Sequence, residues 1–231
     1  MHAALRTMVP FVIVLCCATA QGQEKQKITG WGEVVDPDRD CKIEEAKGVV
    51  SIAVPAGHHD LTYTEDYTKH NAPRIWQPVE GDFSLTVKVL AYPLPKGAES
   101  AGGNHAFVSS GLLLWQDERN YIRMERAAVA ASEAPFLWIE SFRDGATVFR
   151  NLLPLADKNT GLRVVRKGKT TQFWYTNGDQ DEWTEAPVAE SVADAVKLPE
   201  KLKVGVLAIN STKREHAPRL TELKLAVESD K

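Results

Sequence analysis

Apolar and polar residues alternate along much of this chain, and that alternation predicts β-strands. The clearest example is residues 82–89, where Phe, Leu, Val and Val alternate with Asp, Ser, Thr and Lys. Because successive side chains of a strand point to opposite sides, this pattern predicts one buried face and one wet face. Segments of similar strand character are 49–54, 74–77, 110–116, 120–126, 136–142, 162–166, 171–176, 203–209 and 222–227.

Turn signals separate these segments, and helical periodicity is scarce. Asn177-Gly178 and Asp144-Gly145 are typical of tight reversals, because Asn, Asp and Gly tolerate positive φ. Residues 93–105 predict a long loop, and valines at four-residue spacing within 187–197 predict a short surface helix. More than ten short strands with almost no helix predict an all-β fold, a two-sheet antiparallel sandwich.

The first twenty residues have the composition of an export signal. Arg6 precedes a short apolar run over residues 9–17, and Ala18-Thr19-Ala20 offers a small-x-small cleavage site. We therefore expect residues 1–20 to be a signal peptide, 21–29 a flexible segment, and 30–228 one domain. We expect a secreted, periplasmic or other extracytoplasmic protein without a membrane span after cleavage. Lipidation at Cys16 or Cys17 is the alternative, although neither follows the usual small residue.

Charge and cysteine content narrow the function classes. The chain has 28 basic and 31 acidic residues, which is not the basic footprint of a nucleic-acid-binding protein. Cys41 is the one cysteine beyond the signal, and we expect it to be a small buried residue beside a strand. A nucleophilic role would need a histidine brought close by folding. We expect a monomer.

Two longer stretches, Asn71–Phe83 and Gly111–Glu125, are distinctive when taken with Lys203–Val206 and the Asn177-Gly178 turn before Trp183. Together they resemble a bacterial group of concanavalin A-like jelly-roll proteins, a domain family of unknown function labelled "regulation of enolase" and common in planctomycetes. The resemblance spans roughly residues 31–227. It implies a concanavalin A-like jelly roll, a fold shared with lectins, laminarinase-type glucanases and accessory domains of xylosidases. It does not imply an activity, which must be argued from a site.

Carboxylates on the predicted strands are the candidate catalytic groups. The glucanases of this fold carry a Glu-x-Asp-x-x-Glu strand motif, and here Glu80-Gly81-Asp82 is not followed by the second Glu. Alternation instead places Glu125 beside Arg123 on one strand face, and Glu140 beside Trp138 on another. Glu125 and Glu140 are thus either an acid/base pair or part of a cross-strand Arg–Glu network.

Six tryptophans supply candidate sugar-stacking surfaces, although most tryptophans of a large sandwich belong to its core. A polar and aromatic platform on one sheet face is typical of glycan binding. The candidate ligand-binding residues are Arg74, Trp76, Gln116, Arg123, Glu125, Trp138 and Glu140.

Asp36, Asp38 and Asp40 have the spacing of a hard-cation loop, and a structural calcium is one interpretation. The other is an acidic turn, because Cys41 and Lys47 stand where an EF-hand needs Gly and Glu. Adjacent His58 and His59 would point to opposite strand faces, so we do not expect them to share a metal. The sequence shows no zinc-ligand spacing, phosphate-binding glycine loop or Gly-x-Ser-x-Gly elbow, and it predicts no other cofactor.

The hypothesis favoured by the sequence is an exported, non-catalytic, lectin-like module that binds a glycan on the concave sheet. A glycoside hydrolase or lyase using Glu125 and Glu140 is the second hypothesis, and a structural or protein-interaction module of the envelope is the third.

Overall fold

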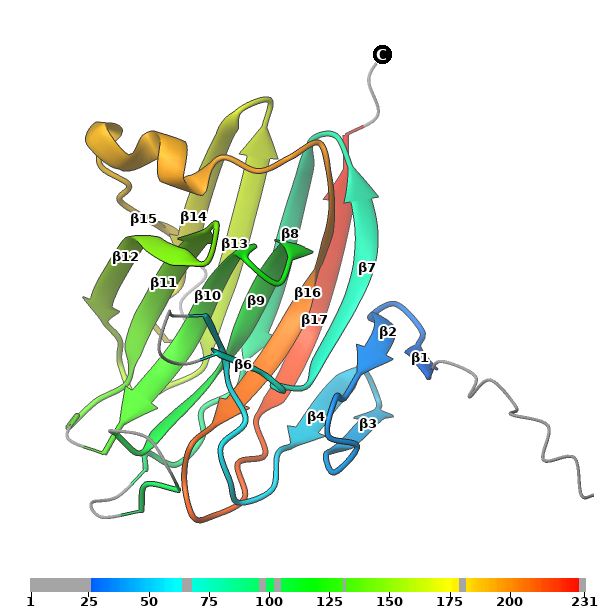
Figure 1. Ribbon diagram of the computed structural model, residues 1–231, viewed down its shortest axis with the longest axis vertical. Coiled ribbons are helices and arrows are strands. Elements are labelled where there is room, and N and C mark those ends of the chain that lie inside the picture. Colours follow the sequence, from blue (N-terminus) through cyan, green and yellow to red (C-terminus); the bar gives the residue numbers. More distant parts are fainter. Residues whose placement is uncertain are drawn as a thin grey trace, which may run out of the picture.

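A computed structural model describes residues 26–63, 68–95, 99–101, 105–130, 132–178 and 182–228. Two antiparallel sheets lie face to face (Figure 1). The predicted two-sheet antiparallel sandwich is therefore confirmed, and its strands are consistent with a jelly roll. The expected signal peptide lies outside the described residues.

The larger sheet, sheet A, has eight strands in the order β1-β2-β7-β16-β9-β10-β11-β12. Its strands are β1 (Lys27–Ile28), β2 (Gly32–Val35), β7 (Arg74–Glu80), β16 (Lys201–Asn210), β9 (Phe107–Asp117), β10 (Asn120–Val129), β11 (Phe136–Arg143) and β12 (Ala146–Pro154).

The smaller sheet, sheet B, has seven strands in the order β15-β14-β13-β8-β17-β4-β3. Its strands are β15 (Thr184–Ala186), β14 (Thr170–Tyr175), β13 (Thr160–Lys167), β8 (Phe83–Val89), β17 (Arg219–Val227), β4 (Val49–Ala53) and β3 (Lys42–Ala46). A separate antiparallel pair, β5 (Leu61–Tyr63) and β6 (Thr68–His70), lies in the connection between β4 and β7.

The main core fills the space between the two sheets, and strand alternation generates it. In β8, Phe83, Leu85, Val87 and Val89 are all buried while the residues between them are half-buried, as the sequence predicts. From sheet A, Ile122 and Met124 of β10 point into the same core. At about 25 cal/mol per Å² of buried apolar surface, this layer is the main source of stability.

A second apolar cluster lies on the outer face of sheet A, the face turned away from sheet B. Trp76, Trp115, Tyr121 and Phe142 are its aromatic members. It is buried because the connection between β4 and β7 folds over it and adds Leu61 and Ala72 (Figure 1). We call residues 55–63 and 68–73 the covering segment. Strand alternation alone would leave this outer face of sheet A exposed to solvent, and the covering segment shields part of it.

Several local predictions differ from the structure. β12 is a full strand that the sequence analysis missed, because it is an edge strand with mostly exposed side chains. The predicted helix is a shorter 3-10 helix, η1 (Glu190–Val196), which packs Val192 and Val196 against the main core. Within the segment expected to be flexible, Lys27–Ile28 forms β1, so sheet A begins before residue 30. Among the described residues, no helix is both long and apolar enough to cross a bilayer.

Candidate functional site

A cluster of charged residues crosses the outer face of sheet A on β10 and β11. Alternation puts Arg123 and Glu125 of β10 on this face, as the sequence predicts, because Ile122 and Met124 take the core side. The antiparallel register then sets Arg123 directly opposite Glu140, and Glu125 opposite Trp138. All four residues therefore lie on one sheet face, which strand alternation alone left open.

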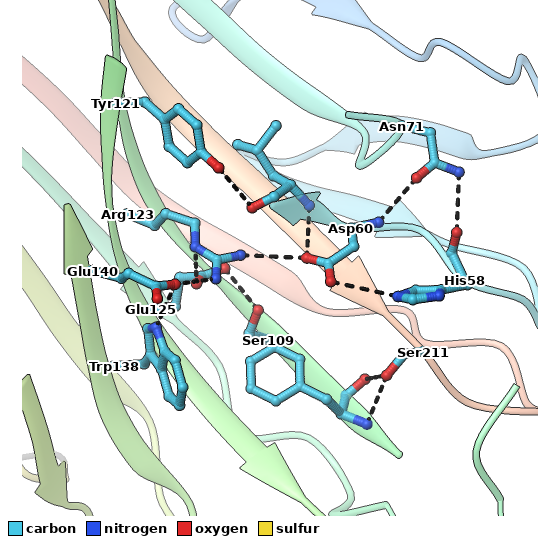
Figure 2. A network of polar contacts seen from close by, with 12 residues as sticks. His58, Asp60, Asn71, Ser109, Tyr121, Arg123, Glu125, Trp138, Glu140 and Ser211 are labelled. Carbon is cyan, nitrogen blue, oxygen red and sulfur yellow. Dashed lines mark hydrogen bonds and ion pairs between the residues drawn. The ribbon is translucent and has the colours of Figure 1, made fainter. Parts of the chain in front are cut away.

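Arg123 is the centre of this cluster and contacts three carboxylates (Figure 2). Its Nη2 donates to Oε2 of Glu140 at 2.6 Å, and its Nη1 lies 3.4 Å from Oδ1 of Asp60. Its Nε lies 3.6 Å from Oε2 of Glu125, an ion-pair contact too long for a hydrogen bond. The side chain of Arg123 is only 6% exposed, so these contacts replace its hydration.

Asp60 belongs to the covering segment and fastens it to the sheet. One carboxylate oxygen accepts from the Leu61 backbone at 2.7 Å and faces Arg123, and the other lies 3.5 Å from Nε2 of His58. Asn71 holds the same segment together, since its amide accepts from the Asp60 backbone and donates to the His58 carbonyl (Figure 2). Tyr121 adds a hydrogen bond from its hydroxyl to the Leu61 carbonyl at 3.2 Å.

The remaining contacts of the two glutamates differ, and so do their pKa values. Burial opposes ionisation of Glu140, but Arg123 and Arg150 outweigh burial and hold its pKa below the usual range. Glu125 is fully buried, and burial raises its pKa although Arg123 and a hydrogen bond from the Ser109 hydroxyl at 2.7 Å oppose the rise. The pKa of Asp60 is lowered despite burial, by His58 and Arg123. Arg123 therefore helps to lower the pKa of Glu140 and of Asp60, and it opposes, without cancelling, the rise that burial causes in the pKa of Glu125.

This charged cluster is closed to solvent as it stands. Glu125 is 0% exposed and Glu140 is 2% exposed. Arg74 and Trp76 are also buried, because the Arg74 guanidinium lies 4.8 Å from the Trp76 ring and donates to the carbonyls of His70 and Ala72. Arg74 and Trp76 lie on β7, which β16 and β9 separate from β10, so the structure does not bring them together with Arg123, Glu125 and Glu140.

Gln116 is separated from the other candidates. It is exposed near the end of β9, and alternation turns it to the side opposite its neighbour Trp115. The structure therefore does not place Gln116 with the outer-face cluster that contains Trp115.

Trp138 is the one member of the candidate set that is both aromatic and partly open to solvent. Its ring lies 5.9 Å from those of Phe107 and Phe136, both also partly open, and the Arg150 guanidinium lies 5.0 Å from it. Leu152, directly opposite Trp138 on β12, is 49% exposed. We call these five residues the Trp138 platform.

Hydrogen bonds to Glu140 link the Trp138 platform to the charged cluster. The Trp138 indole donates from Nε1 to Oε2 of Glu140 at 3.2 Å, and Arg150 Nε donates to the other carboxylate oxygen at 3.0 Å. Glu140 thus fixes the orientation of both the indole and the guanidinium. Sequence reasoning missed Arg150 and Leu152 because β12 was not recognised, and it missed Asp60 because the covering segment has no periodic pattern. A hint for β12 was available in the Asp144-Gly145 turn, which predicts a strand on either side.

The three aspartates of the acidic loop do not converge on one point. Both Asp36 carboxylate oxygens accept backbone N–H groups of its own turn, from Arg39 at 3.1 Å and Cys41 at 2.9 Å. Asp38 and Asp40 turn instead towards His59. Cys41 is half-buried, and burial with Asp36 and Asp40 raises the pKa of its thiol, which disfavours a nucleophilic thiolate.

Comparison with known proteins shows likeness in structure only. No protein family matches the sequence, and no curated protein matches it. A functionally unknown protein from Saccharomyces cerevisiae superposes with a TM-score of 0.67 at 11% identity, over 87% of this chain and 98% of that one.

Two solved enzymes also share the fold. A xylan beta-1,4-xylosidase from Bacillus halodurans matches with a TM-score of 0.53 at 15% identity, over 80% of this chain and 34% of that one. An alginate lyase from Klebsiella pneumoniae matches with a TM-score of 0.51 at 10% identity, over 84% of this chain and 86% of that one. At these identities the likeness defines the fold, an antiparallel β-sandwich. The chain spans about a third of the xylosidase.

Proposed function

We propose that this protein is an exported, non-catalytic carbohydrate-binding module of the concanavalin A-like "regulation of enolase" group, and that it binds its glycan on the Trp138 platform. The observation that carries the proposal is a partly open indole held in place by Glu140, flanked by Arg150 and two further aromatic rings. The β-sandwich likeness to a xylosidase and an alginate lyase supports a carbohydrate ligand.

The platform has the mixture of surfaces that a sugar ring requires. The C–H faces of a pyranose pack on an indole, and neighbouring charged groups read its hydroxyls. Here Trp138 and Leu152 supply apolar surface, while Arg150, half-exposed at 50%, lies over the Trp138 ring and presents guanidinium donors there. Because Glu140 already orients Trp138 and Arg150, little side-chain freedom would be lost on binding.

The burial of the two glutamates favours binding over hydrolysis. Glycoside hydrolysis by a carboxylate pair requires both groups to reach the scissile bond. Glu125 and Glu140 are closed off, and Glu140 is occupied by Arg123, Arg150 and Trp138. A substrate would have to displace these partners to reach either carboxylate.

We expect Trp138→Ala to weaken polysaccharide binding at least about tenfold, or about 1.4 kcal/mol, because it removes the central stacking surface. Retardation of the purified protein in affinity gels that contain a panel of polysaccharides measures the effect. Trp174→Ala is the matched control, since Trp174 is also partly open but lies on β14 of the opposite sheet. Equal retardation of both variants and the parent would rule out the Trp138 platform as the binding surface.

Hydrolysis or lyase action is the second candidate, and one observation favours it. The pKa values of Glu125 and Glu140 move in opposite directions while both contact Arg123, as expected for an acid paired with an ionised partner. Assays of reducing-sugar release and of unsaturated product on the same polysaccharides test it. Binding without product supports the module. Product formation that is lost in both Glu125→Gln and Glu140→Gln would instead establish an enzyme.

A further inference from the structure

Folding brings together three side chains of different chemistry that do not belong to the Trp138 platform. Asp40 and Cys41 end the turn between β2 and β3, and His59 belongs to the covering segment. One ligand atom of each, a carboxylate oxygen, the thiol sulfur and an imidazole nitrogen, all lie within 4.8 Å of one another. No other such group of three or more occurs among the described residues.

The separations fit the spacing of ligands around one small cation. His59 Nε2 lies 3.2 and 3.1 Å from the two oxygens of Asp40, and Cys41 Sγ lies 3.5 Å from Oδ1 of Asp40. Zinc bonds of about 2.0–2.3 Å at tetrahedral angles place neighbouring donor atoms about 3.3–3.7 Å apart. The Asp40 carboxylate is therefore close to this spacing from both other donors, and the Cys41 sulfur and the His59 nitrogen lie within 4.8 Å of each other.

We propose that Asp40, Cys41 and His59 form a binding site for a zinc-type divalent cation. Nitrogen and sulfur donors select zinc and similar borderline metals, whereas calcium takes six to eight oxygens. Asp38 Oδ2, 4.0 Å from His59 Nε2, or a water would complete the coordination. Asp36, Asp38 and Asp40, which the sequence offered as a calcium site or an acidic turn, do not gather around one point, because Asp36 accepts hydrogen bonds from its own turn.

The burial and contacts of His59 determine which of its ring nitrogens could ligate a cation. The residue is only 4% exposed, and its Nδ1 has no hydrogen-bond partner among the described residues. The polar contacts of this ring are therefore confined to its Nε2 side, which faces Asp40 and Asp38. Nε2, the ring nitrogen that is hydrogen-bonded to Asp40, is therefore the one that would bind a cation placed between Asp40, Cys41 and His59.

The backbone around the three donors is fixed before any metal binds. The Asp36 carboxylate holds the N–H of Cys41, and His59 exchanges backbone hydrogen bonds of 2.8 and 3.0 Å with Asn210 of β16. Asn71 also ties Asp38 to the covering segment at 2.5 Å. A cation here would therefore clamp the β2–β3 turn to the segment that carries Asp60, independently of any glycan.

Cobalt(II) is a suitable probe because its spectrum reports both geometry and thiolate ligation. The purified protein is expected to bind one equivalent, with visible bands typical of tetrahedral cobalt and a near-ultraviolet thiolate charge-transfer band. Zinc should displace the cobalt and abolish both signals. Cys41→Ser should lose the charge-transfer band, and His59→Gln should weaken cobalt and zinc binding at least about tenfold, since even outer-shell partners of a metal contribute that much.

His58→Gln is the matched control, because His58 is the adjacent imidazole but pairs with Asp60 rather than with the cluster. It should retain the stoichiometry, the spectrum and the affinity of the parent. Circular dichroism of each variant without metal separates lost ligation from lost folding. Absence of cobalt and zinc binding, or binding that Cys41→Ser and His59→Gln leave unchanged, would overturn the proposal. Calcium binding without a cobalt signal would do so as well.

Discussion

Replacement of Arg123 by methionine is expected to lower the free energy of unfolding by about 3–5 kcal/mol, because it leaves buried carboxylates without their cation. Glu140 and Glu125, at 2% and 0% exposure, would lose the charge that compensates their desolvation, and Asp60 would lose its link to the sheet. For a domain of this size the melting temperature should fall by roughly 6–20 °C. Urea unfolding at neutral pH, followed by tryptophan fluorescence, measures the loss.

Arg150→Met is the matched control for Arg123→Met. Arg150 pairs with the same Glu140, but its side chain is 50% exposed, so water can replace it and the expected cost is about 1 kcal/mol or less. Adding Glu140→Met to Arg123→Met should recover part of the stability, since two buried apolar side chains cost less than one unpaired charge. Similar losses for Arg123→Met and Arg150→Met would contradict the central role of the buried arginine.

Acidification from pH 6.5 towards pH 3 is expected to remove about 4–5 kcal/mol of stability through His216 alone, at about 1.4 kcal/mol per pKa unit. His216 lies within the fold between Tyr92 and the β4 end, and burial lowers its pKa from 6.5 to about 3. Between these values the unfolded chain binds a proton that the folded chain does not. The contribution of His216 to the free energy of unfolding is therefore fully present above pH 6.5. It falls as the pH falls, until the imidazole of the folded protein also protonates near pH 3.

The effect of His216 on acid sensitivity can be isolated by comparing how steeply the free energy of unfolding changes with pH in the parent and in a variant. Free energies of unfolding at several pH values between 4 and 6 should fall less steeply with acid in His216→Phe than in the parent, by about 1.4 kcal/mol per pH unit. Phenylalanine preserves a buried ring against Tyr92 while removing the titrating group. His105→Gln is the reference variant, because it removes an imidazole that is exposed to solvent. Parallel slopes for the parent and His216→Phe would show that His216 does not drive the acid sensitivity.

The sequence by itself determined the all-β sandwich and the face that many strand residues occupy. Alternation is a local property of the extended backbone, so it separates Ile122 and Met124 from Arg123 and Glu125 without knowledge of the neighbouring strands. The same rule put Trp138 and Glu140 on one face of their strand. It could not recognise β12, because an edge strand buries too few side chains to show a clear period.

Only the tertiary structure decided what those faces do. The covering segment has no periodic pattern, yet it buries the outer-face aromatics and sets Asp60 against Arg123. The register of β10 and β11 pairs Arg123 with Glu140, and β12 adds Arg150 beside Trp138. Cys41 and His59 come together across separate loops, without any ligand spacing in the sequence. Strand patterns are set by neighbours along the chain, whereas burial, ion pairing and ligand geometry depend on contacts between distant segments that local periodicity does not encode.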